Sequence, residues 1–311
     1  MTPTRARSDV ADAYHDLRPL LFSIAYRMLG SVSEAEDLVQ EAFVRYQRAL
    51  VDGVAVESPK AWLSAVVTRA AIDHLRSARV RRETYVGEWL PEPLVTDDGA
   101  GDPAAHVAEL DSLSMSFLVL LERLTPVERA VFLLHDVFDY DFEEVAKIVE
   151  KAPATCRQHA VRARRFVADN RPRFDASESD RDELVGRFLA AAERGDIQTL
   201  IDALAEDVMV QGDGGGKVPQ WSAPIAGADK VARMFAGLGR QVRRLGTTFE
   251  PHRVNGQPGV IFRGPNRGVM SVMSFEVLGG RITRIRSIVN PDKLSHLGAV
   301  ESLREVLDGV S

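Results

Sequence analysis

Apolar residues spaced three and four positions apart dominate the start of this chain, and over residues 9–85 they mark three amphipathic helices. The first helix is expected to close at Gly30, because glycine is favoured just after a helix C-terminus. The second opens with a predicted capping box of Ser33 and Glu36. The third opens at Pro59, since proline suits the first helical turn. These residues predict an all-helical domain.

A second helical block, residues 112–170, has the pattern of a helix-turn-helix. Thr125 and Glu128 predict a capping box at its lead-in helix. Pro153 separates the next two helices, and the later one buries Cys156. A helix with a basic and amide-bearing face suits a DNA major groove, whereas the alternative is a solvated face on an ordinary surface helix. That face presents Arg157, Gln158, His159, Arg162, Arg164 and Arg165.

The pattern changes after a boundary at residues 171–180. Helical spacing continues over 184–192, 197–204 and 228–238, and strand patterns follow over 247–254, 259–263, 268–278 and 281–290. The pairs Asn255-Gly256 and Gly279-Gly280 predict tight hairpin turns, because both positions of such turns favour positive φ. Helices followed by an antiparallel meander indicate an α+β domain over residues 181–311.

Residues 86–111 form a linker with seven acidic residues and no lysine or arginine. Prolines and glycines without helical period predict an irregular segment. Its first part contains Trp89, Leu90 and Leu94, which need burial, so we expect that part to pack on a domain. The remainder reads as flexible, and we hypothesise that its negative charge covers basic faces when DNA is absent.

Composition narrows the class of protein further. The chain has 311 residues, 45% of them hydrophobic and 27% charged, with a net charge of −6. A net negative charge means that any contact with nucleic acid must be local. The sole cysteine, Cys156, excludes an intramolecular disulfide and a cysteine-based zinc site. The first ten residues lack an apolar signal core and no apolar run approaches membrane length. We therefore expect a cytoplasmic protein without a cofactor or a membrane partner.

Two separated segments resemble the extracytoplasmic-function (ECF) sigma factors of bacteria. The run LRPLLFSIAYRMLGSVSEAEDLVQEAFVRY, followed by SPKAWLSAVVTRAAIDHLRSARVRR, is similar to region two. The run from LTPVERAVFLL to TCRQHAVRARR is similar to region four. Three further motifs, WLPEPL, DGGGK and NPDKL, match the ECF subgroup that carries a fused SnoaL-like, NTF2-like C-terminal domain. The resemblance implies a region two domain at 9–85 and a region four domain at 112–170.

The resemblance also implies partners and site residues. Region two would bind the clamp coiled coil of the largest catalytic subunit of core RNA polymerase through Asp37, Gln40 and Glu41, and region four would contact the flap of the other large subunit. Trp62 and Tyr85 are candidates for base stacking, although the helical spacing of Trp62 favours the core. The minus-ten strand would meet Ser58, Lys60, Arg69, Arg76, Arg79, Arg81 and Arg82. In the minus-thirty-five duplex, Arg157, Gln158, Val161 and Arg162 would face bases, and Arg164 and Arg165 phosphates.

The C-terminal domain is expected to act as a fused regulator. We expect the DGGGK loop and the NPDKL motif to approach the linker or region two and to set the spacing of the sigma domains. Lys217 would then reach a carboxylate or carbonyl of that partner. The predicted regulatory residues are Trp89, Leu90, Pro91, Asp213, Gly214, Gly215, Gly216, Lys217, Asn290, Pro291, Asp292, Lys293 and Leu294.

Two other functions stay open at this point. NTF2-like cones often enclose a pocket, and the candidate catalytic residues would be Asp213, Trp221, His252 and Glu276. None of them has a partner visible in the sequence, so we expect that the chain is not an enzyme. The alternatives are a DNA-binding regulator that senses a small ligand in the cone, and a SnoaL-like enzyme with a DNA-binding head. A pocket with convergent polar groups would favour the enzyme.

Overall fold

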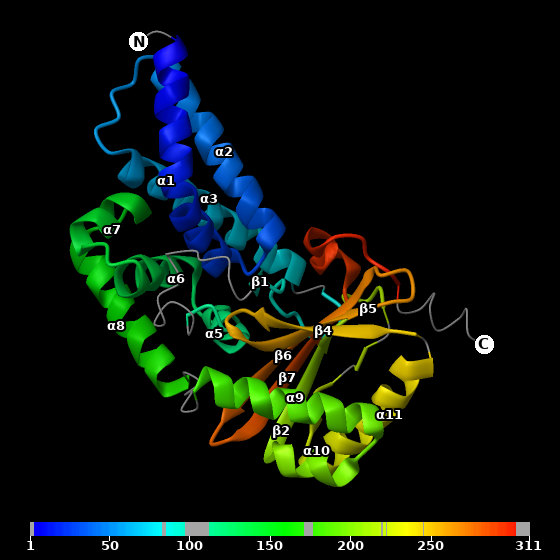
Figure 1. The fold of residues 1–311 in the computed structure, drawn as a ribbon. Coiled ribbons are helices and arrows are strands. Elements are labelled where there is room, and N and C mark those ends of the chain that lie inside the picture. Colours follow the sequence, from blue (N-terminus) through cyan, green and yellow to red (C-terminus); the bar gives the residue numbers. More distant parts are fainter. Residues whose placement is uncertain are drawn as a thin grey trace. The chain divides into compact units, whose positions relative to one another are not determined.

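The computed structural model describes the backbone of residues 3–82, 85–96, 112–170 and 177–302, apart from positions 219, 222 and 245. The chain divides into two compact units. A helical unit combines Met1–Glu83 with Asp102–Arg171, and a sheet unit combines Thr84–Gly101 with Pro172–Ser311. Figure 1 shows the helices and strands from which each unit is built.

The helical unit begins with three long helices, as the apolar spacing predicted. They are α1 (Pro3–Leu29), α2 (Val32–Val51) and α3 (Pro59–Arg82). The predicted capping box at Ser33 is wrong, because the cap of α2 is Ser31, whose side chain accepts a hydrogen bond from the N–H of Glu34. Gly30 has a φ of 68° and ends α1, so the chain turns early and Ser31 takes the extended conformation of an N-cap.

The helix-turn-helix follows in the same unit. Its elements are α5 (Met115–Leu121), α6 (Pro126–Phe132), a π-helix η1 (Leu133–Val137), α7 (Phe142–Val149) and α8 (Pro153–Asn170). The capping box of Thr125 and Glu128 is confirmed with both of its hydrogen bonds. Asp141 and Glu144 form a second capping box at α7 that the sequence analysis missed.

The helices of the sheet unit cover one face of its sheet (Figure 1). They are α9 (Glu178–Arg194), α10 (Ile197–Ala203) and α11 (Ala228–Arg244). The core between them is aromatic at its centre, where the ring of Phe188 lies 5.0 Å from Phe235 and 5.8 Å from Phe275. All three side chains are buried, so this part of the cone is filled by its own residues.

The strands form one sheet in the order β1-β4-β5-β6-β7-β2-β3. Their bounds are β1 (Val95–Thr96), β2 (Leu204–Asp213), β3 (Ile225–Ala226), β4 (Thr248–Val254), β5 (Gln257–Arg263), β6 (Val269–Leu278) and β7 (Arg281–Ile288). The meander β4 to β7 is antiparallel, as predicted, and β2 joins it parallel to β7. Both residues of each predicted turn, at Asn255 and at Gly279, have positive φ.

Part of the predicted linker belongs to the sheet unit. Val95 and Thr96 pair with Val254 and Arg253 of β4, so the sheet gains an edge strand from a segment that was expected to be irregular. Just before β1, the N–H of Leu94 donates to the side chain of Asn255. We call residues 85–96 the linker segment. Residues 97–111 lie outside the described part of the chain.

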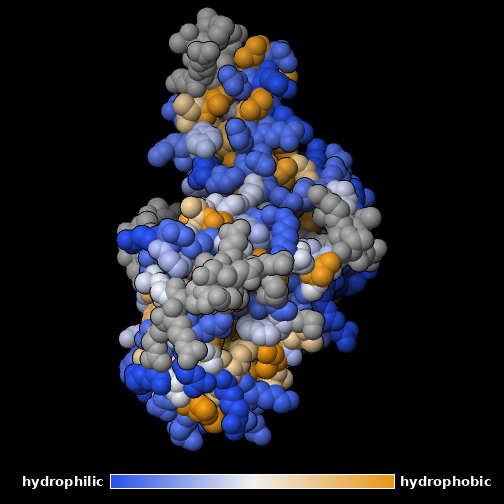
Figure 2. Space-filling view, turned by 90° about the vertical axis from the view of Figure 1, so that its right-hand side faces the viewer, coloured by the Kyte–Doolittle hydropathy of each residue, from blue (hydrophilic) through white to orange (hydrophobic). Residues whose placement is uncertain are grey.

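The face of the molecule drawn in Figure 2 is mostly hydrophilic. On the face drawn in Figure 2, hydrophobic residues lie in small separate groups among hydrophilic ones. Among the helices that the structure describes, none combines the length and apolar character that a bilayer crossing requires.

Candidate functional site

The outer face of α2 is acidic and exposed, as the sequence predicted for its docking face. Asp37, Gln40 and Glu41 are exposed on the helix, whose opposite side is buried. Val44, one turn beyond Gln40, is 40% exposed although it is apolar. Arg45 donates to Glu41 over 3.1 Å. The face thus combines carboxylates with an exposed apolar side chain, and its role in docking stays a prediction.

The outer face of α8 presents the basic set predicted for DNA. The exposed side chains of this face are Arg157, Gln158, Val161 and Arg162. The side chain of Val161 is 63% exposed although it is apolar. Cys156 is buried on the inner face, where burial raises the pKa of its thiol. A protonated buried thiol fits a packing role. The helix therefore has an inner face of small buried residues and an exposed outer face of arginines and Gln158.

Acidic residues stand beside several of these arginines. The guanidinium of Arg164 lies 2.6 Å from a carboxylate oxygen of Asp136, and that of Arg162 lies 3.6 Å from Glu128. Ion pairs of this half-exposed kind are weak, so phosphate can displace them. The Nε of Arg164 would have to leave the carboxylate of Asp136 before it could contact a phosphate.

The residues predicted to bind the minus-ten strand have different surroundings in the structure. Ser58 caps α3 by accepting a hydrogen bond from the N–H of Ala61 over 3.2 Å. Ser58 and Lys60 also line a hollow of about 860 Å³ between α1, α2 and the loop that precedes α3. Arg76 pairs with Asp73 on the helix surface. The side chains of Arg79, Arg81 and Arg82 lie outside the described residues.

The remaining minus-ten candidates have other partners. The ring of Trp62 lies 5.6 Å from that of Tyr46, and the side chain is half-buried, so the choice between core packing and base stacking stays open. Lys60 lies over the ring of Tyr140, and Arg69 contacts the end of α7. Tyr85 is part of the sheet unit and is hydrogen-bonded there, so the expectation that it stacks on bases beside region two does not fit this structure.

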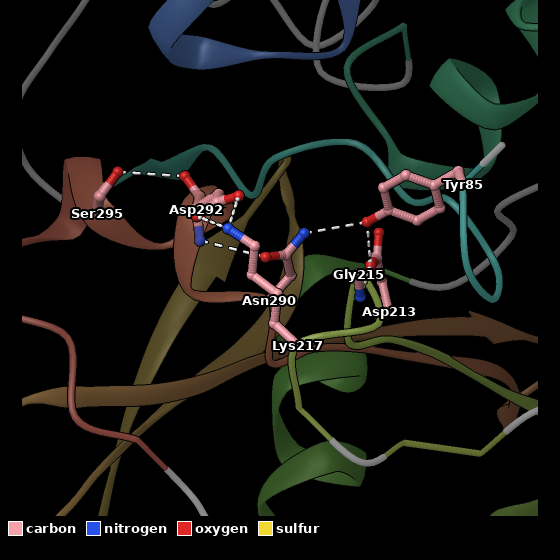
Figure 3. A network of polar contacts seen from close by, with 7 residues as sticks. All are labelled: Tyr85, Asp213, Gly215, Lys217, Asn290, Asp292 and Ser295. Carbon is pink, nitrogen blue, oxygen red and sulfur yellow. Dashed lines mark hydrogen bonds and ion pairs between the residues drawn. The ribbon is translucent and has the colours of Figure 1, made fainter. Parts of the chain in front are cut away.

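A buried polar cluster binds the linker segment to the C-terminal domain (Figure 3). Asp213, at the end of β2, is fully buried, and its carboxylate receives four hydrogen bonds. Two come from the linker segment, namely the hydroxyl of Tyr85 at 2.5 Å and the N–H of Leu90 at 2.8 Å. The others come from the N–H of Gly215 at 3.0 Å and the ammonium of Lys293 at 2.6 Å. A carboxylate this deep is stable only with such a set of donors.

Lys293 completes this linker-binding cluster. Its side chain is 8% exposed and donates to the carbonyl of Leu90 as well as to Asp213. Its ammonium also lies 4.4 Å from the ring centre of Trp89 and 5.1 Å from that of Tyr85. Aromatic faces attract a cation, so the two rings add to the ion pair.

Tyr85 is held from both sides, because Asn290 donates its side-chain N–H to the hydroxyl of Tyr85 over 3.0 Å. Burial raises the pKa of Tyr85, and the hydrogen bond to Asp213 raises it further. The phenol therefore stays protonated and keeps donating to the carboxylate. The first residue of DGGGK and two residues of NPDKL thus bind one end of the linker.

Two glycines of DGGGK allow this close packing. Both Gly215 and Gly216 have left-handed φ angles, of 59° and 71°. A Cβ on Gly215 would stand 2.3 Å from the side chain of Asn290, and one on Gly216 would stand 3.0 Å from Val86 of the linker segment. Any larger residue would push one of these partners away.

The expectation for Lys217 is corrected by the structure. Its ammonium pairs with the carboxylate of Asp292 at 2.6 Å, so DGGGK and NPDKL are joined to each other inside one domain. Both side chains are more than half exposed, so this pair adds little stability. The other motif residues serve packing: Leu90, Pro91 and Leu294 are buried, Pro291 opens a short 3-10 helix, and Gly214 precedes the turn.

The four catalytic candidates do not surround a common pocket. Asp213 binds the linker segment, Glu276 is paired with the buried Arg286, and His252 lies 3.8 Å from Glu250. Trp221 packs against the apolar core. A hollow of about 20 Å³ among the described core residues is lined by Leu189, Phe235, Leu238, Phe249 and Phe262 and by few polar groups. Among the described residues, no group of three or more His, Cys, Asp or Glu could hold a metal ion.

A basic helix-turn-helix, a helical domain with an exposed acidic helix face and an α+β domain bound to the linker segment are the parts expected of a sigma factor with a fused C-terminal domain. Two family models match the helical regions, Sigma-70 region 2 over residues 13–81 and Sigma-70, region 4 over residues 114–167. The chain belongs to the family of ECF RNA polymerase sigma factors.

Individual relatives match nearly the whole chain. The ECF RNA polymerase sigma factor SigJ of Mycobacterium tuberculosis is 39% identical over 298 residues, covering 91% of this chain and 92% of the relative. SigI of the same species, a probable ECF RNA polymerase sigma factor, is 32% identical over 292 residues, covering 93% of this chain and 96% of the relative. The crystal structure of the M. tuberculosis sigma factor SigJ matches with a TM-score of 0.71 and 36% identity, covering 92% of this chain and 98% of that one. The predicted family and fold class are thereby confirmed.

Proposed function

We propose that this sigma factor reads the minus-thirty-five duplex with α8, holds the melted minus-ten strand at α3 and the loop before it, and docks on core RNA polymerase through α2. The observation that carries the proposal is the exposed stripe of Arg157, Gln158 and Val161 on α8. Arginine and glutamine bind base edges in the major groove, and an apolar side chain fits a thymine methyl group.

The polymerase contacts are assigned by the same reasoning. Asp37, Gln40 and Glu41 form an exposed acidic face, to which Val44 adds an apolar contact. We assign this face to the clamp coiled coil of the largest subunit, and the helix-turn-helix to the flap of the other large subunit. The protein would act in the cytoplasm, where core polymerase works.

The hollow beside Ser58 and Lys60 supports a place for one base of the melted strand. Its volume of about 860 Å³ exceeds that of a single base, and the loop that forms one wall is exposed. Single-stranded DNA offers unstacked bases to such a hollow, whereas a duplex does not.

We propose further that the C-terminal domain controls transcription by holding the linker. The linker segment supplies the strand β1 to the sheet and two hydrogen bonds to Asp213. A linker bound in this way cannot extend freely between the two sigma regions. We place the first sigma domain at residues 9–83 and the second at 112–170, and we join residues 85–96 to the C-terminal domain at 181–311.

The competing roles of the C-terminal domain have less support. The hollow among the core residues, of about 20 Å³, is too small for a ligand beyond a water molecule. A second hollow of about 270 Å³ is lined by His252, Asp182 and Arg253, and none of the other three catalytic candidates lines it. The scattered positions of His252 and Glu276 favour a domain that regulates without catalysis.

Run-off transcription with core polymerase tests the proposal. Lys293→Met removes the buried charge from the linker-binding cluster, and Lys217→Met removes an exposed charge from the same pair of motifs as a matched control. We expect Lys293→Met and a truncation after Asp180 to change the yield of transcript, and Lys217→Met to leave it unchanged. Equal transcription by the full chain, the truncation and Lys293→Met would refute regulation through the linker.

A further inference from the structure

The helix α3 is bonded to the helix-turn-helix within the helical unit. The guanidinium of Arg69 donates to the carbonyls of Ile148 and Lys147 over 2.8 and 2.7 Å. It also lies 2.9 Å from the carboxylate of Glu150. One side chain of the predicted region two thus makes three polar contacts with residues at the end of α7.

The position of Arg69 is electrostatically favourable. The last carbonyls of a helix have no intrahelical partner and carry the negative end of the helix dipole. The planar guanidinium offers several N–H groups at once, so it satisfies two of these carbonyls together. Glu150 follows α7 with a left-handed φ of 56°, and its side chain also reaches Arg69. Arg69 therefore acts as a C-terminal cap supplied by another domain.

Two further contacts connect α3 with Tyr140, two positions before α7. The hydroxyls of Ser64 and Tyr140 are 2.8 Å apart, and both side chains are buried. The ammonium of Lys60 lies 5.0 Å from the centre of the Tyr140 ring. We call the contacts of Lys60, Ser64 and Arg69 with Tyr140 and α7 the α3–α7 junction.

Two side chains of this junction, Lys60 and Arg69, are also the ones proposed to bind the minus-ten strand. We propose that single-stranded DNA and the helix-turn-helix compete for α3, so that the protein without DNA is held closed by the α3–α7 junction. The proposal rests on the proposed role of Lys60 and Arg69 in binding the minus-ten strand. In the closed state Arg69 binds carbonyl and carboxylate oxygens in place of phosphate. The ammonium of Lys60 lies over the ring of Tyr140 in place of a DNA contact.

The ion pair of the junction is exposed and can open to water, whereas the hydrogen bond of Ser64 with Tyr140 is buried. The side chains of Arg69 and Glu150 are 44% and 69% exposed, so their ion pair is weak and water can enter it. A different link between the regions is buried: Arg129 of α6 donates to the carbonyl of Met28 in α1. Replacing Arg129 would endanger folding, so the exposed Glu150 is the better position for a test.

The test measures binding of a short fluorescent single-stranded DNA of mixed sequence to the full chain. Glu150→Arg should repel Arg69 and raise the affinity by about twofold to tenfold, the range for an exposed ion pair that becomes a repulsion. Asp169→Arg, at the end of α8, makes the same change of charge away from the junction and serves as the control. The pair Arg69→Glu with Glu150→Arg keeps only the ion pair of the junction, because a carboxylate cannot donate to the carbonyls of Lys147 and Ile148. It also removes the strand contact, so its affinity should fall below that of Glu150→Arg.

Hydrogen exchange separates the junction from the DNA contact. Residues 140–150 should exchange faster in Glu150→Arg without DNA, and in the wild type when the single strand is added. Equal affinities for Glu150→Arg and Asp169→Arg, or unchanged exchange in residues 140–150, would overturn the competition. Arg69→Ala tests the underlying role alone: undiminished DNA affinity together with faster exchange would show that Arg69 holds the junction without binding the strand.

Discussion

Lys293 provides the sharpest test of how the C-terminal domain holds the linker. Its ammonium is the one formal positive charge that the structure places on the buried carboxylate of Asp213 within the described residues, and it also binds the carbonyl of Leu90. Lys293→Met keeps the length and apolar stem of the side chain and removes the charge. Asp213 would keep its hydrogen bonds from Tyr85, Leu90 and Gly215.

The size of the effect follows from these contacts. Removing one partner of a buried ion pair costs about 3–5 kcal/mol, because the other charge stays buried. The three remaining donors to Asp213 reduce this cost, and the lost attraction to the rings of Trp89 and Tyr85 adds about 0.5–2 kcal/mol. We expect Lys293→Met to weaken the attachment of the linker segment by about 3 kcal/mol, or roughly a hundredfold in the docking equilibrium.

Hydrogen exchange at the amide of Leu90 measures this attachment directly, because that N–H is bonded to Asp213. Urea unfolding gives the change in the free energy of unfolding. Adding Asp213→Asn to Lys293→Met should recover part of the loss, since no unpaired charge is then buried. A change below about 1 kcal/mol, with unchanged protection of Leu90, would refute the reasoning.

Three further predictions concern other parts of the molecule. Tyr85→Phe should destabilise the protein by about 1–3 kcal/mol through the lost hydrogen bond to Asp213. Because burial and Asp213 raise the pKa of Tyr85, its contribution is complete below the unfolded pKa of about 10 and is lost as the pH rises above it. Urea unfolding at pH values from about 8 to 11 should show a steeper decline in the wild type than in Tyr85→Phe, which keeps the contribution of the buried Tyr140. Arg157→Ala should cost about 1–3 kcal/mol in promoter binding and relax the preference at one base, whereas uniform weakening on all sequences would show a phosphate contact. Glu41→Arg should abolish retention of core polymerase in a pull-down, with Glu206→Arg, the same charge reversal at an exposed position of the C-terminal domain, as the control. Equal retention by both variants would remove α2 as the docking face.

Local features of the fold were predictable from sequence. The turn at Asn255-Gly256 has positive φ at both residues, since few other residue pairs adopt that geometry at low cost. The capping box of Thr125 and Glu128 depends on two residues three positions apart, and it forms as predicted. The error at Ser33 is equally local: Ser31 lies two positions earlier, and the conformation of Gly30 decided between them.

The site was predictable only in part. The exposed face of Asp37, Gln40 and Glu41 follows from helical spacing, and Val44 would have completed it at the next turn. The motif residues Asp213, Asn290 and Lys293 were identified by resemblance, but their partners were not. Tyr85 lies 128 positions from Asp213 in the chain, and no local pattern relates them.

The sequence by itself determined the helices of the two sigma regions, the hairpin turns and the family, because spacing, caps and motifs act over a few residues. Tertiary structure alone decided which groups meet. It placed Tyr85 and Leu90 on Asp213 and made residues 95 and 96 an edge strand. It also bonded Arg69 to α7. Each of these contacts joins polar groups far apart in the chain, and a buried or capping polar group takes whichever partner the packed core brings within reach.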